Sequence, residues 1–492
     1  MNDSINHGPF RHDHYDVVIV GAALAGCATA KAMAMADPEQ RRRILVIDRC
    51  VGVHPRFSGE FIHPRGAAAL EELGFYDALS AAGAIDVDGF AVFENADARH
   101  VDLAYANVPN QRPRGLSVHH KVLVQVQRQV VADSHVELVE GWAVRELVRG
   151  ERGEVRGVVV DTRDGHKARL TADLVVGADG KASTVRKLAG ITDEGRRTIG
   201  FTAGVEVHDA SLPRPTYAHV FLGGWGPVLA YPILKRDGRV STRVTFDLPV
   251  DLPAKGARLR EHIMRTYLPF VPSPLAAEIA AALAAGKGPL EMAPTVELPA
   301  PSAVAPGLAL VGDAGGCSHP ITASGMTMGL LDATTLGREA RRRAHVPAGQ
   351  AWLDAASLRR YRVEHDRYVP TRQVLAAAIY EAFRGGQAGE RAIRRALFDY
   401  WESGPVARSR SMSLLSCAED RASVFLTEYL KAAGHALGTS LVPRHASYFP
   451  VTDRLRRARG AASMAQGKLG LVAQVMWAQL RPSWLPHASA RL

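Results

Sequence analysis

One glycine-rich stretch of the sequence holds residues that can bind a polar, anionic cofactor. It begins with Gly312-Asp313, directly after the apolar run 308–311, and ends with Gly325-Met326, where a helix-like segment starts. Asp313 can accept a hydrogen bond from a cofactor hydroxyl. The N–H groups of Gly325 and Met326 would lie at a helix N-terminus, where partial positive charge favours a phosphate or a negative ring system. The stretch therefore predicts a cofactor loop between a strand and a helix.

A second glycine-rich segment lies near the start of the chain. The apolar run 17–20 is followed by Gly21 and Gly26 and by an alanine-rich helix pattern, and a second apolar run ends in Asp48. This is the βαβ pattern of dinucleotide binding, in which the acidic residue holds a ribose. Alanine stands where the pattern has its central glycine. Small residues before a helix can also serve close packing alone, so this motif by itself leaves both interpretations open.

A third segment again joins an apolar strand to a turn and a helix. The run 174–178 leads into Asp179-Gly180, and Ser183 is placed to cap the expected helix. An ordinary turn before a capped helix is the alternative interpretation. Three such segments in one chain indicate a cofactor domain that is assembled from distant parts of the sequence.

In their order and separations, these segments resemble those of FAD-dependent monooxygenases. Further motifs, Arg56-Phe57-Ser58-Gly59-Glu60-Phe61-Ile62-His63-Pro64 and His319-Pro320-Ile321-Thr322, are similar to the squalene monooxygenase (squalene epoxidase) branch. The resemblance implies an α/β + α fold. It consists of a Rossmann-like FAD-binding domain of the hydroxylase type, an antiparallel β-sheet substrate domain and a helical C-terminal region.

The positions of the motifs predict the domain boundaries. The discontinuous FAD-binding domain takes residues 14–80, 116–190 and 295–345, the substrate domain takes 81–115 and 191–294, and the helical region takes 346–492. The helices of that region are expected to break near Pro370, Gly385-Gly386, Gly404-Pro405 and Pro443. The substrate domain contains short strand-like stretches joined by turns with Gly or Asp. Such a sequence of strands favours an antiparallel sheet that covers the flavin.

The resemblance carries FAD contacts over to ten positions: Leu24, Ala25, Asp48, Arg49, Arg56, Phe61, Arg128, Ala143, Asp313 and Met326. The three motifs add Gly21, Gly26, Asp179 and Gly325 as cofactor-binding residues. Arg56 and Arg128 suit this role because the pyrophosphate of FAD needs fixed cations or N–H donors. Either arginine can instead be a solvated surface charge.

The resemblance also implies a reaction. FAD would be reduced, would react with O₂ and would form a C4a-hydroperoxide, whose distal oxygen passes to an electron-rich alkene or aromatic carbon. His63 and Phe90 stand where squalene epoxidases are expected to have a glutamine and a tyrosine near the flavin, so they are the candidate catalytic residues. His63 can donate a hydrogen bond to the substrate or the hydroperoxide, or it can be a neutral, structurally bonded histidine.

The expected substrate is an apolar molecule, an isoprenoid or a prenylated or aromatic natural product, that is epoxidised or hydroxylated. Phe90, Phe221, Trp225 and Tyr231 are candidates for lining a dry pocket. Electrons would come from NAD(P)H, directly or through a flavin reductase partner. Two alternatives stay open: an FAD-dependent reductase of isoprenoid double bonds, and a flavin- or lipid-binding protein without turnover.

Composition supports a folded enzyme. The chain has 492 residues, of which 47% are hydrophobic, enough to fill the cores of two or more lobes. Its net charge is +10, but the arginine-rich runs 41–43 and 341–343 lack the interleaved aromatic residues on which single-stranded nucleic acid stacks. We therefore expect no nucleic-acid partner. Cys27, Cys50, Cys317 and Cys417 have no metal-ligand spacing, which predicts no metal site and a reduced, cytoplasmic protein.

The sequence of the C-terminal part allows two locations for its helices, on a membrane surface or against the protein core. No apolar run reaches the roughly 18 residues that a membrane span needs. Residues 467–480 alternate small and apolar groups, and they stand where squalene epoxidases carry helices that dock on membranes. An interfacial helix with peripheral membrane contact is one interpretation. The other is a helix packed on the protein's own core, and residues 422–437 pose the same choice.

Overall fold

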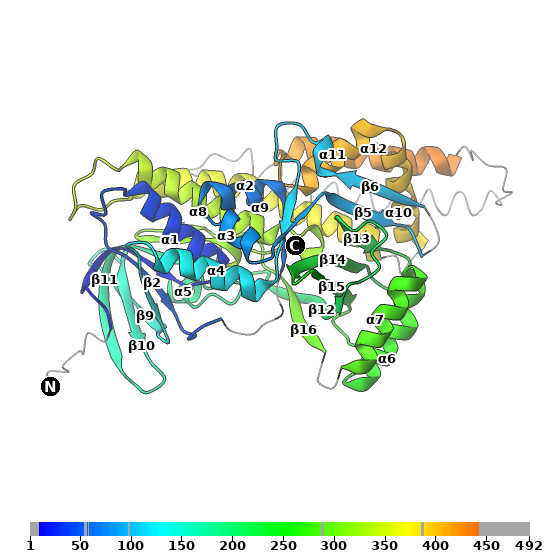
Figure 1. Ribbon diagram of the computed structural model, residues 1–492. Coiled ribbons are helices and arrows are strands. Elements are labelled where there is room, and N and C mark those ends of the chain that lie inside the picture. Colours follow the sequence, from blue (N-terminus) through cyan, green and yellow to red (C-terminus); the bar gives the residue numbers. More distant parts are fainter. Residues whose placement is uncertain are drawn as a thin grey trace.

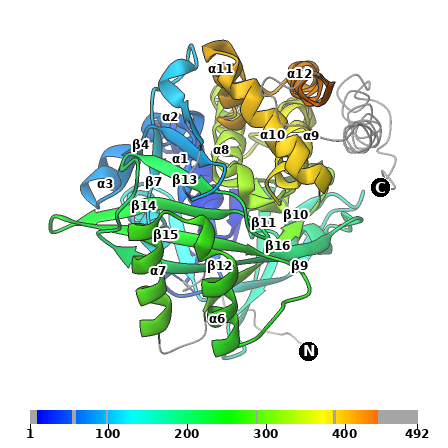
Figure 2. The same ribbon diagram turned by 90° about the vertical axis from the view of Figure 1, so that its right-hand side faces the viewer.

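The computed structural model describes residues 9–53, 57, 59–96, 99–286, 290–384 and 388–441. Two large sheets lie next to each other, and helices cover both (Figure 1). Figure 2 shows α6 (Ala257–Thr266) and α7 (Ser273–Ala285) below the second sheet, and α9 (Ala355–Arg384), α10 (Ala388–Glu402), α11 (Pro405–Leu415) and α12 (Ala422–Leu441) above it. The chain thus forms two lobes, and a small third sheet lies at their junction.

The first sheet has eight strands. Its parallel centre runs β18-β11-β1-β2-β8, formed by β18 (Leu308–Leu310), β11 (Lys167–Gly177), β1 (His14–Val20), β2 (Ile44–Asp48) and β8 (Glu137–Glu140). Antiparallel strands complete it: β17 (Val304–Ala305), β9 (Ala143–Arg149) and β10 (Val155–Asp161). Val17 and Ile19 of β1 enter one core and Val18 and Val20 another. The central strands are apolar on both faces because both faces are covered.

Helices of the first lobe lie mainly over one face. They are α1 (Leu24–Ala36), α2 (Pro64–Glu72), α3 (Tyr76–Ala81), α4 (His120–Ala132) and α8 (Gly325–Arg342), and the short α5 (Thr184–Leu188) follows β11. α1 packs closely on α8. A Cβ on Gly337 of α8 would lie 2.7 Å from the Cβ of Ala32 on α1, and one on Gly329 would lie 3.3 Å from that of Ala25. Glycine and alanine therefore allow the two helix backbones to approach.

The second sheet has seven strands in the order β16-β12-β15-β14-β13-β5-β6. Their bounds are β5 (Gly89–Phe93), β6 (His100–Ala104), β12 (Arg197–His208), β13 (Tyr217–Phe221), β14 (Val228–Arg236), β15 (Arg239–Leu248) and β16 (Glu291–Glu297). All neighbours are antiparallel except β5 and β13, which are parallel because they come from separate parts of the chain and no hairpin joins them. The expected antiparallel sheet is thus present with one parallel pair.

The two faces of this sheet meet different partners. One face packs on α6 (Ala257–Thr266) and α7 (Ser273–Ala285), and it includes Phe93 and Phe221. The other face, with Phe90 and Tyr231, packs toward the C-terminal helices. A three-stranded sheet of β3 (Phe61–Ile62), β7 (Gly115–Ser117) and β4 (Ile85–Val87) connects the lobes.

Four helices form the described C-terminal part: α9 (Ala355–Arg384), α10 (Ala388–Glu402), α11 (Pro405–Leu415) and α12 (Ala422–Leu441). The sequence predicts a break near Pro370, and this is wrong: α9 continues through Pro370. Buried contacts of Tyr368, Val369 and Val374 on either side hold the helix together despite the lost N–H donor. The expected break at Gly404-Pro405 is present. In the described residues we find no helix with the length and hydropathy of a membrane span.

Several sequence-based expectations fall on residues outside the described part. They concern Arg56, the expected breaks at Gly385-Gly386 and Pro443, the segment 467–480 and the end of the helical region beyond residue 441. The domain boundaries that the motifs predict stay a prediction.

The α1–α8 contact generates a stability prediction. Gly337→Ala adds a methyl group 2.7 Å from the Cβ of Ala32, so the free energy of unfolding should fall by about 1–3 kcal/mol through overpacking. The matched control is Gly434→Ala in α12, where nothing lies within 4 Å of the added Cβ. That change should be neutral or stabilising by up to about 1 kcal/mol, because alanine favours helix. Thermal unfolding measures both, and equal melting temperatures for the two variants contradict the prediction.

Candidate functional site

The first glycine-rich turn leaves a helix N-terminus without a side-chain cap. Gly21 has φ +109°, and a Cβ there would lie 2.6 Å from the carbonyl oxygen of Ala178. A Cβ on Gly26 would lie 1.7 Å from the carbonyl oxygen of Gly21. Both positions therefore require glycine. The N-cap residue of α1 is Ala23, which makes no capping bond, and the first turn contains no acidic residue. An uncapped N-terminus of this kind suits a pyrophosphate.

Asp48 and Arg128 hold this turn in place. Asp48 Oδ2 accepts from the N–H of Ala22 at 2.8 Å, and Oδ1 accepts from the N–H of Cys50 at 2.8 Å. Arg128 on α4 donates to the carbonyl of Ala22 at 2.7 Å, lies 3.1 Å from Asp48 Oδ2 and pairs with Glu140 at 2.5 Å. Most of the Arg128 donors are thus used inside the protein, which makes it a positioning residue for the turn.

The second cofactor loop brings Asp313 to the start of α8. Asp313 lies exposed in the short turn Gly312–Ala314. A Cβ on Gly325 would lie 3.7 Å from Asp313 Oδ1, and one on Gly59 would lie 3.7 Å from the side chain of Met326. Ser324, the N-cap residue of α8, makes no side-chain capping bond. α8 therefore presents a second uncapped N-terminus, next to three of the residues that the sequence predicts as FAD contacts.

The two uncapped N-termini fit FAD. Ala25 on α1 lies 3.0 Å from where a Cβ of Gly312 would be, so the turn before α1 and the loop before α8 are neighbours. One N-terminus can take the pyrophosphate and the other the ring, since both groups carry negative charge that a helix N-terminus stabilises. Of the other predicted contacts, Leu24 and Phe61 are buried, Ala143 is half-buried at the start of β9, and Arg49 is exposed.

Asp179 has a role in the fold itself. Ser183 is the N-cap residue of α5 and accepts from the N–H of Arg186 at 3.0 Å, and the Asp179 carboxylate accepts from the N–H groups of Thr184 at 2.6 Å and Val185 at 3.1 Å. α5 carries Arg186, which is fully buried and donates to the carbonyl of Ala314 at 3.0 Å. The third motif thus supports the loop that carries Asp313. Direct contact of Asp179 with the cofactor stays a prediction.

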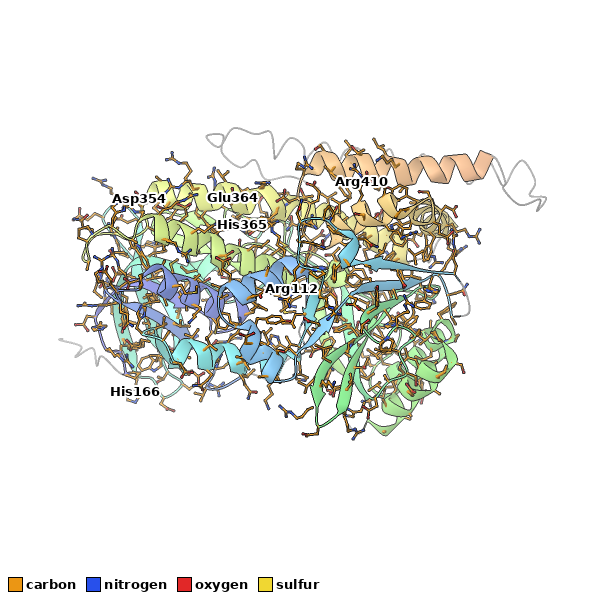
Figure 3. The ribbon with its side chains drawn as sticks, turned by 45° about the horizontal axis from the view of Figure 1, so that its top comes forward. Arg112, His166, Asp354, Glu364, His365 and Arg410 are labelled. Carbon is orange, nitrogen blue, oxygen red and sulfur yellow. The ribbon has the colours of Figure 1, made fainter. Side chains whose placement is uncertain are left out.

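The sequence analysis did not predict a buried polar cluster beneath the loop that carries Asp313. Asp332 on α8 accepts from the N–H of Gly312 at 2.8 Å and from His365 Nδ1 at 2.8 Å, and the hydroxyl of Tyr368 also donates to it. Figure 3 shows His365 on α9 within the interior of the first lobe. Burial alone would lower the pKa of His365, but the Asp332 carboxylate, together with Asp366 and the hydrogen bond to the carbonyl of Gly315, raises it. A single acidic residue in the otherwise uncharged stretch 325–337 was the signal available in the sequence.

His63 is enclosed by protein partners. Its Nε2 lies 2.6 Å from the carbonyl of Thr322, and its Nδ1 lies 2.7 Å from the hydroxyl of Tyr105. A carbonyl only accepts, so Nε2 carries the proton and Nδ1 accepts from Tyr105. Burial lowers the pKa of His63 to about 4, which keeps the ring neutral at neutral pH. The geometry agrees with the structurally bonded alternative.

Aromatic rings surround His63. The Phe90 ring centroid lies 5.1 Å from that of Phe61 and 5.9 Å from that of His63, and Tyr231 lies 5.9 Å from Phe61. Phe90 and Tyr231 therefore join one wall at the junction of the lobes. Two other predicted pocket residues do not: Phe221 lies on the opposite face of the sheet and Trp225 is 67% exposed.

A buried ion pair joins the two lobes beside this wall. Arg243 on β15 binds both carboxylate oxygens of Glu60, at 2.7 and 3.0 Å, and its Nη1 reaches Glu291 at 2.9 Å. Glu60 is adjacent to Phe61, and Arg243 pairs in register with Tyr231. The pair thus fixes the substrate sheet against the segment that carries Phe61 and His63. Sequence reasoning quoted Glu60 in a motif but missed Arg243, since no local pattern marks it.

The low pKa of His63 generates a prediction about pH. The folded protein keeps His63 neutral above pH about 4, whereas the unfolded chain binds a proton below its ordinary value of 6.5. Unfolding therefore takes up a proton in this window, and the free energy of unfolding should fall as pH falls from 6.5 to 4, by roughly 3 kcal/mol from this group. Urea unfolding at a series of pH values measures the slope.

His63→Gln removes the titrating group and keeps an amide that can both donate and accept. Its slope between pH 6.5 and 4 should be correspondingly smaller, while His219, whose pKa burial also lowers to about 4, still contributes in both proteins. His166→Gln changes a histidine on the surface (Figure 3) and serves as the control with the slope of the unaltered protein. An unchanged slope in His63→Gln contradicts the assignment.

Comparisons with known proteins agree with this site. The squalene epoxidase family model matches residues 171–452, and an FAD binding domain model matches residues 14–230. The squalene epoxidase of Aspergillus fumigatus is 30% identical over 446 residues, covering 90% of each chain. The squalene monooxygenase of Mus musculus is 27% identical and covers 86% of this chain and 71% of its own.

Solved structures share the fold. The p-nitrophenol 4-monooxygenase PnpA of Pseudomonas putida superposes with a TM-score of 0.66 at 20% identity, over 82% of this chain and 99% of its own. PqsL of Pseudomonas aeruginosa gives a TM-score of 0.58 at 23% identity, over 82% and 99%. The predicted FAD-binding α/β fold is confirmed. This chain belongs to the squalene epoxidase family, and it is an FAD-dependent monooxygenase of an apolar substrate.

Proposed function

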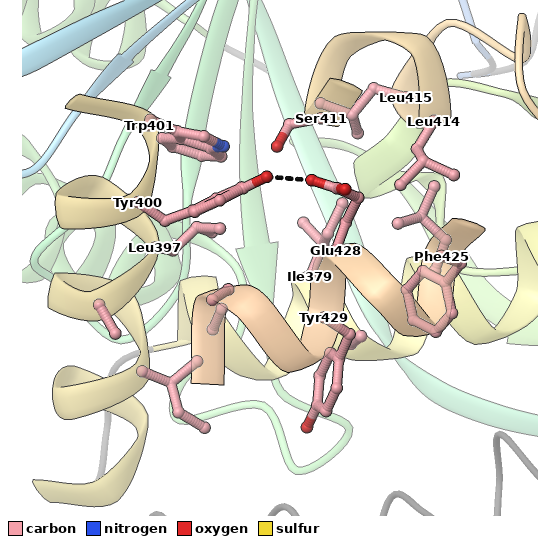
Figure 4. Close-up of a pocket in the computed structure, with 16 residues that line it drawn as sticks. Ile379, Leu397, Tyr400, Trp401, Ser411, Leu414, Leu415, Phe425, Glu428 and Tyr429 are labelled. Carbon is pink, nitrogen blue, oxygen red and sulfur yellow. Dashed lines mark hydrogen bonds between the residues drawn. The ribbon is translucent and has the colours of Figure 1, made fainter. Parts of the chain in front are cut away.

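We propose that this monooxygenase adds oxygen to an electron-rich carbon of an isoprenoid or prenylated molecule, one end of which lies among the C-terminal helices. The observation that carries the proposal is a cavity between α9, α10, α11 and α12 (Figure 4). Its volume is about 120 Å³, comparable with engineered apolar cavities of about 150 Å³ that hold one benzene ring. It therefore suits one end of a longer substrate.

Sixteen residues line the cavity, and most are apolar: Leu375, Ala378, Ile379, Ala382, Ile393, Ala396, Leu397, Tyr400, Trp401, Ser411, Leu414, Leu415, Phe425, Glu428, Tyr429 and Ala432. Ala382 and Trp401 belong to the same continuous cluster of buried apolar side chains as Phe61 and Phe90. The side chains between the cavity and the aromatic wall are therefore apolar, as a substrate with a hydrocarbon chain requires.

FAD, when bound, supplies the activation of O₂ and the oxygen transfer. The protein's own residues exclude water and orient the substrate. Phe61, Phe90 and Tyr231 make the wall beside the predicted flavin site apolar, which delays side reactions with water. The N-terminus of α8 would offer its N–H groups to negative charge on the flavin ring. We assign His63 a positioning role, because its bonds fix Tyr105 and the turn at Thr322.

We further propose that the electrons of NAD(P)H reach this protein through a separate reductase. The test uses the FAD-loaded protein with NADPH, with and without an added flavin reductase, and with squalene and a prenylated phenol as probe substrates. Under ¹⁸O₂, one labelled oxygen atom should enter the product, and only when the reductase is present. Turnover with NADPH alone contradicts the reductase requirement and leaves oxygen transfer intact.

The same reaction without O₂ distinguishes the proposed oxygen transfer from the alternative, a reductase of isoprenoid double bonds. A product in which a double bond of the substrate has been reduced to a single bond, formed without O₂, overturns oxygen transfer to an isoprenoid. Its matched control is the same mixture opened to air, where the oxygenated product should replace any reduced one. Anaerobic photoreduction of the bound FAD before mixing removes dependence on the choice of reductase.

We also propose peripheral membrane contact through the C-terminal helices. Val406 on α11 is 67% exposed and Leu430 on α12 is 48% exposed. The half-exposed cations Arg410 and Lys431 are nearby in sequence, and Figure 3 shows Arg410 at the edge of these helices. Apolar side chains next to cations suit an anionic lipid surface.

Vesicle flotation tests this contact. The full chain should float with phosphatidylglycerol-containing vesicles and less with neutral ones, and Leu430→Glu should reduce the bound fraction several-fold through lost apolar burial and added negative charge. Met35→Glu, which changes another exposed apolar residue far from these helices in the sequence, is the control. Equal flotation of both variants contradicts the role of α12.

A further inference from the structure

The cavity among the C-terminal helices is not uniformly apolar. Tyr400, Trp401, Ser411 and Glu428 contribute polar atoms to its lining. Figure 4 shows the indole nitrogen of Trp401, the hydroxyls of Tyr400 and Ser411 and the carboxylate of Glu428 turned toward the same part of the cavity. A binding site for a pure hydrocarbon has no use for these groups, because burying polar atoms against hydrocarbon is unfavourable.

Glu428 is held as a buried carboxylate. Its side chain is 4% exposed, and the hydroxyl of Tyr400 donates to its Oε2. Lys431 donates to Oε1 at 2.8 Å, and Arg410 lies 3.8 Å from the same oxygen. The two cations balance the charge from outside the cavity, so the carboxylate remains an acceptor at the cavity wall. Each carboxylate oxygen can accept more than one hydrogen bond.

Trp401 supplies the complementary donor. The residue is 2% exposed, and among the residues that the structure describes its Nε1 has no hydrogen-bond partner. Indole nitrogen only donates, so a matching ligand atom must accept. A hydroxyl group is the simple chemical group that accepts from Trp401 and donates to Glu428 at once. A carbonyl or an ether satisfies the first bond alone.

We propose that the cavity recognises a hydroxyl group at one end of the substrate, so that this enzyme acts on an isoprenoid alcohol or a phenol with an apolar tail. The inference rests on the proposed function, since it assumes that the cavity receives the substrate's end. The hydroxyl lies at Trp401 and Glu428, and the reacting carbon lies toward Phe61 and Phe90. The resident polar groups thereby select the substrate and its direction.

The test compares geranylgeraniol with the hydrocarbon of the same chain that lacks the hydroxyl. Binding to the oxidised, FAD-loaded protein is measured by calorimetry, without turnover. The alcohol should bind roughly tenfold more tightly, the usual effect of one to two hydrogen bonds to buried groups. Trp401→Phe keeps the ring and removes the N–H donor, so it should weaken the alcohol several-fold and leave the hydrocarbon unchanged.

Two further variants keep the result interpretable. Trp352→Phe removes another buried indole N–H, which donates to the carbonyl of Ala340 outside the cavity, and it should change neither affinity. If Trp401→Phe fails to fold, Glu428→Gln provides the test instead: it should reduce the difference in affinity between the alcohol and the hydrocarbon. Equal affinity of the two compounds for the unaltered protein, loss of both in Trp401→Phe, or binding of neither overturns the proposal. A clear preference for the alcohol without oxygenation of it would uphold hydroxyl recognition and refute oxygen transfer to this class.

Discussion

The close contact between α1 and α8 decides where the cofactor can lie. The two helices come from segments far apart in the chain, and small residues, Ala25 and Ala32 against Gly329 and Gly337, let their backbones meet. That contact places two uncapped helix N-termini next to each other. Larger side chains would separate the helices, and with them the two positions where negative charge is stabilised. Asp48, Arg128, Arg186 and Asp332 then fix the loops that feed these helices.

The ion pair of Glu60 and Arg243 transmits this arrangement to the substrate lobe. Both side chains are at most 5% exposed, and the bidentate geometry admits one relative placement of β15 and the segment before β3. A buried ion pair adds little net stability compared with apolar residues, but removal of one partner leaves a costly unpaired charge. The pair therefore fixes the position of these two segments relative to each other. It keeps Phe61 of one lobe against Phe90 and Tyr231 of the other.

The sequence predicts the features that depend on local patterns. The glycine-rich turns, the strands before them and the break at Gly404-Pro405 all follow from residues within a few positions of one another. It does not predict features made by tertiary packing. The cluster around Asp332 and the partner of Glu60 arise only when distant helices and strands meet, and the continuity of α9 through Pro370 depends on its burial. Phe221 and Trp225 show the same limit in reverse. Aromatic type alone did not predict that Phe221 joins the opposite face of the sheet, or that Trp225 lies exposed between two strands.

The hydrogen bonds of His63 connect the segment beside the predicted cofactor site with the segment beside the aromatic wall. Both of its ring nitrogens are used by Tyr105 and Thr322, so the polar side chain at this position offers no atom to a ligand. Phe90 has no hydroxyl, and Tyr105, from a neighbouring part of the same lobe, supplies one to His63 instead. His63 and Phe90 therefore leave no free donor or acceptor in the wall beside the predicted flavin site. The described cavity at Trp401 and Glu428 offers a donor and an acceptor, and we propose that selection by hydrogen bonding occurs there.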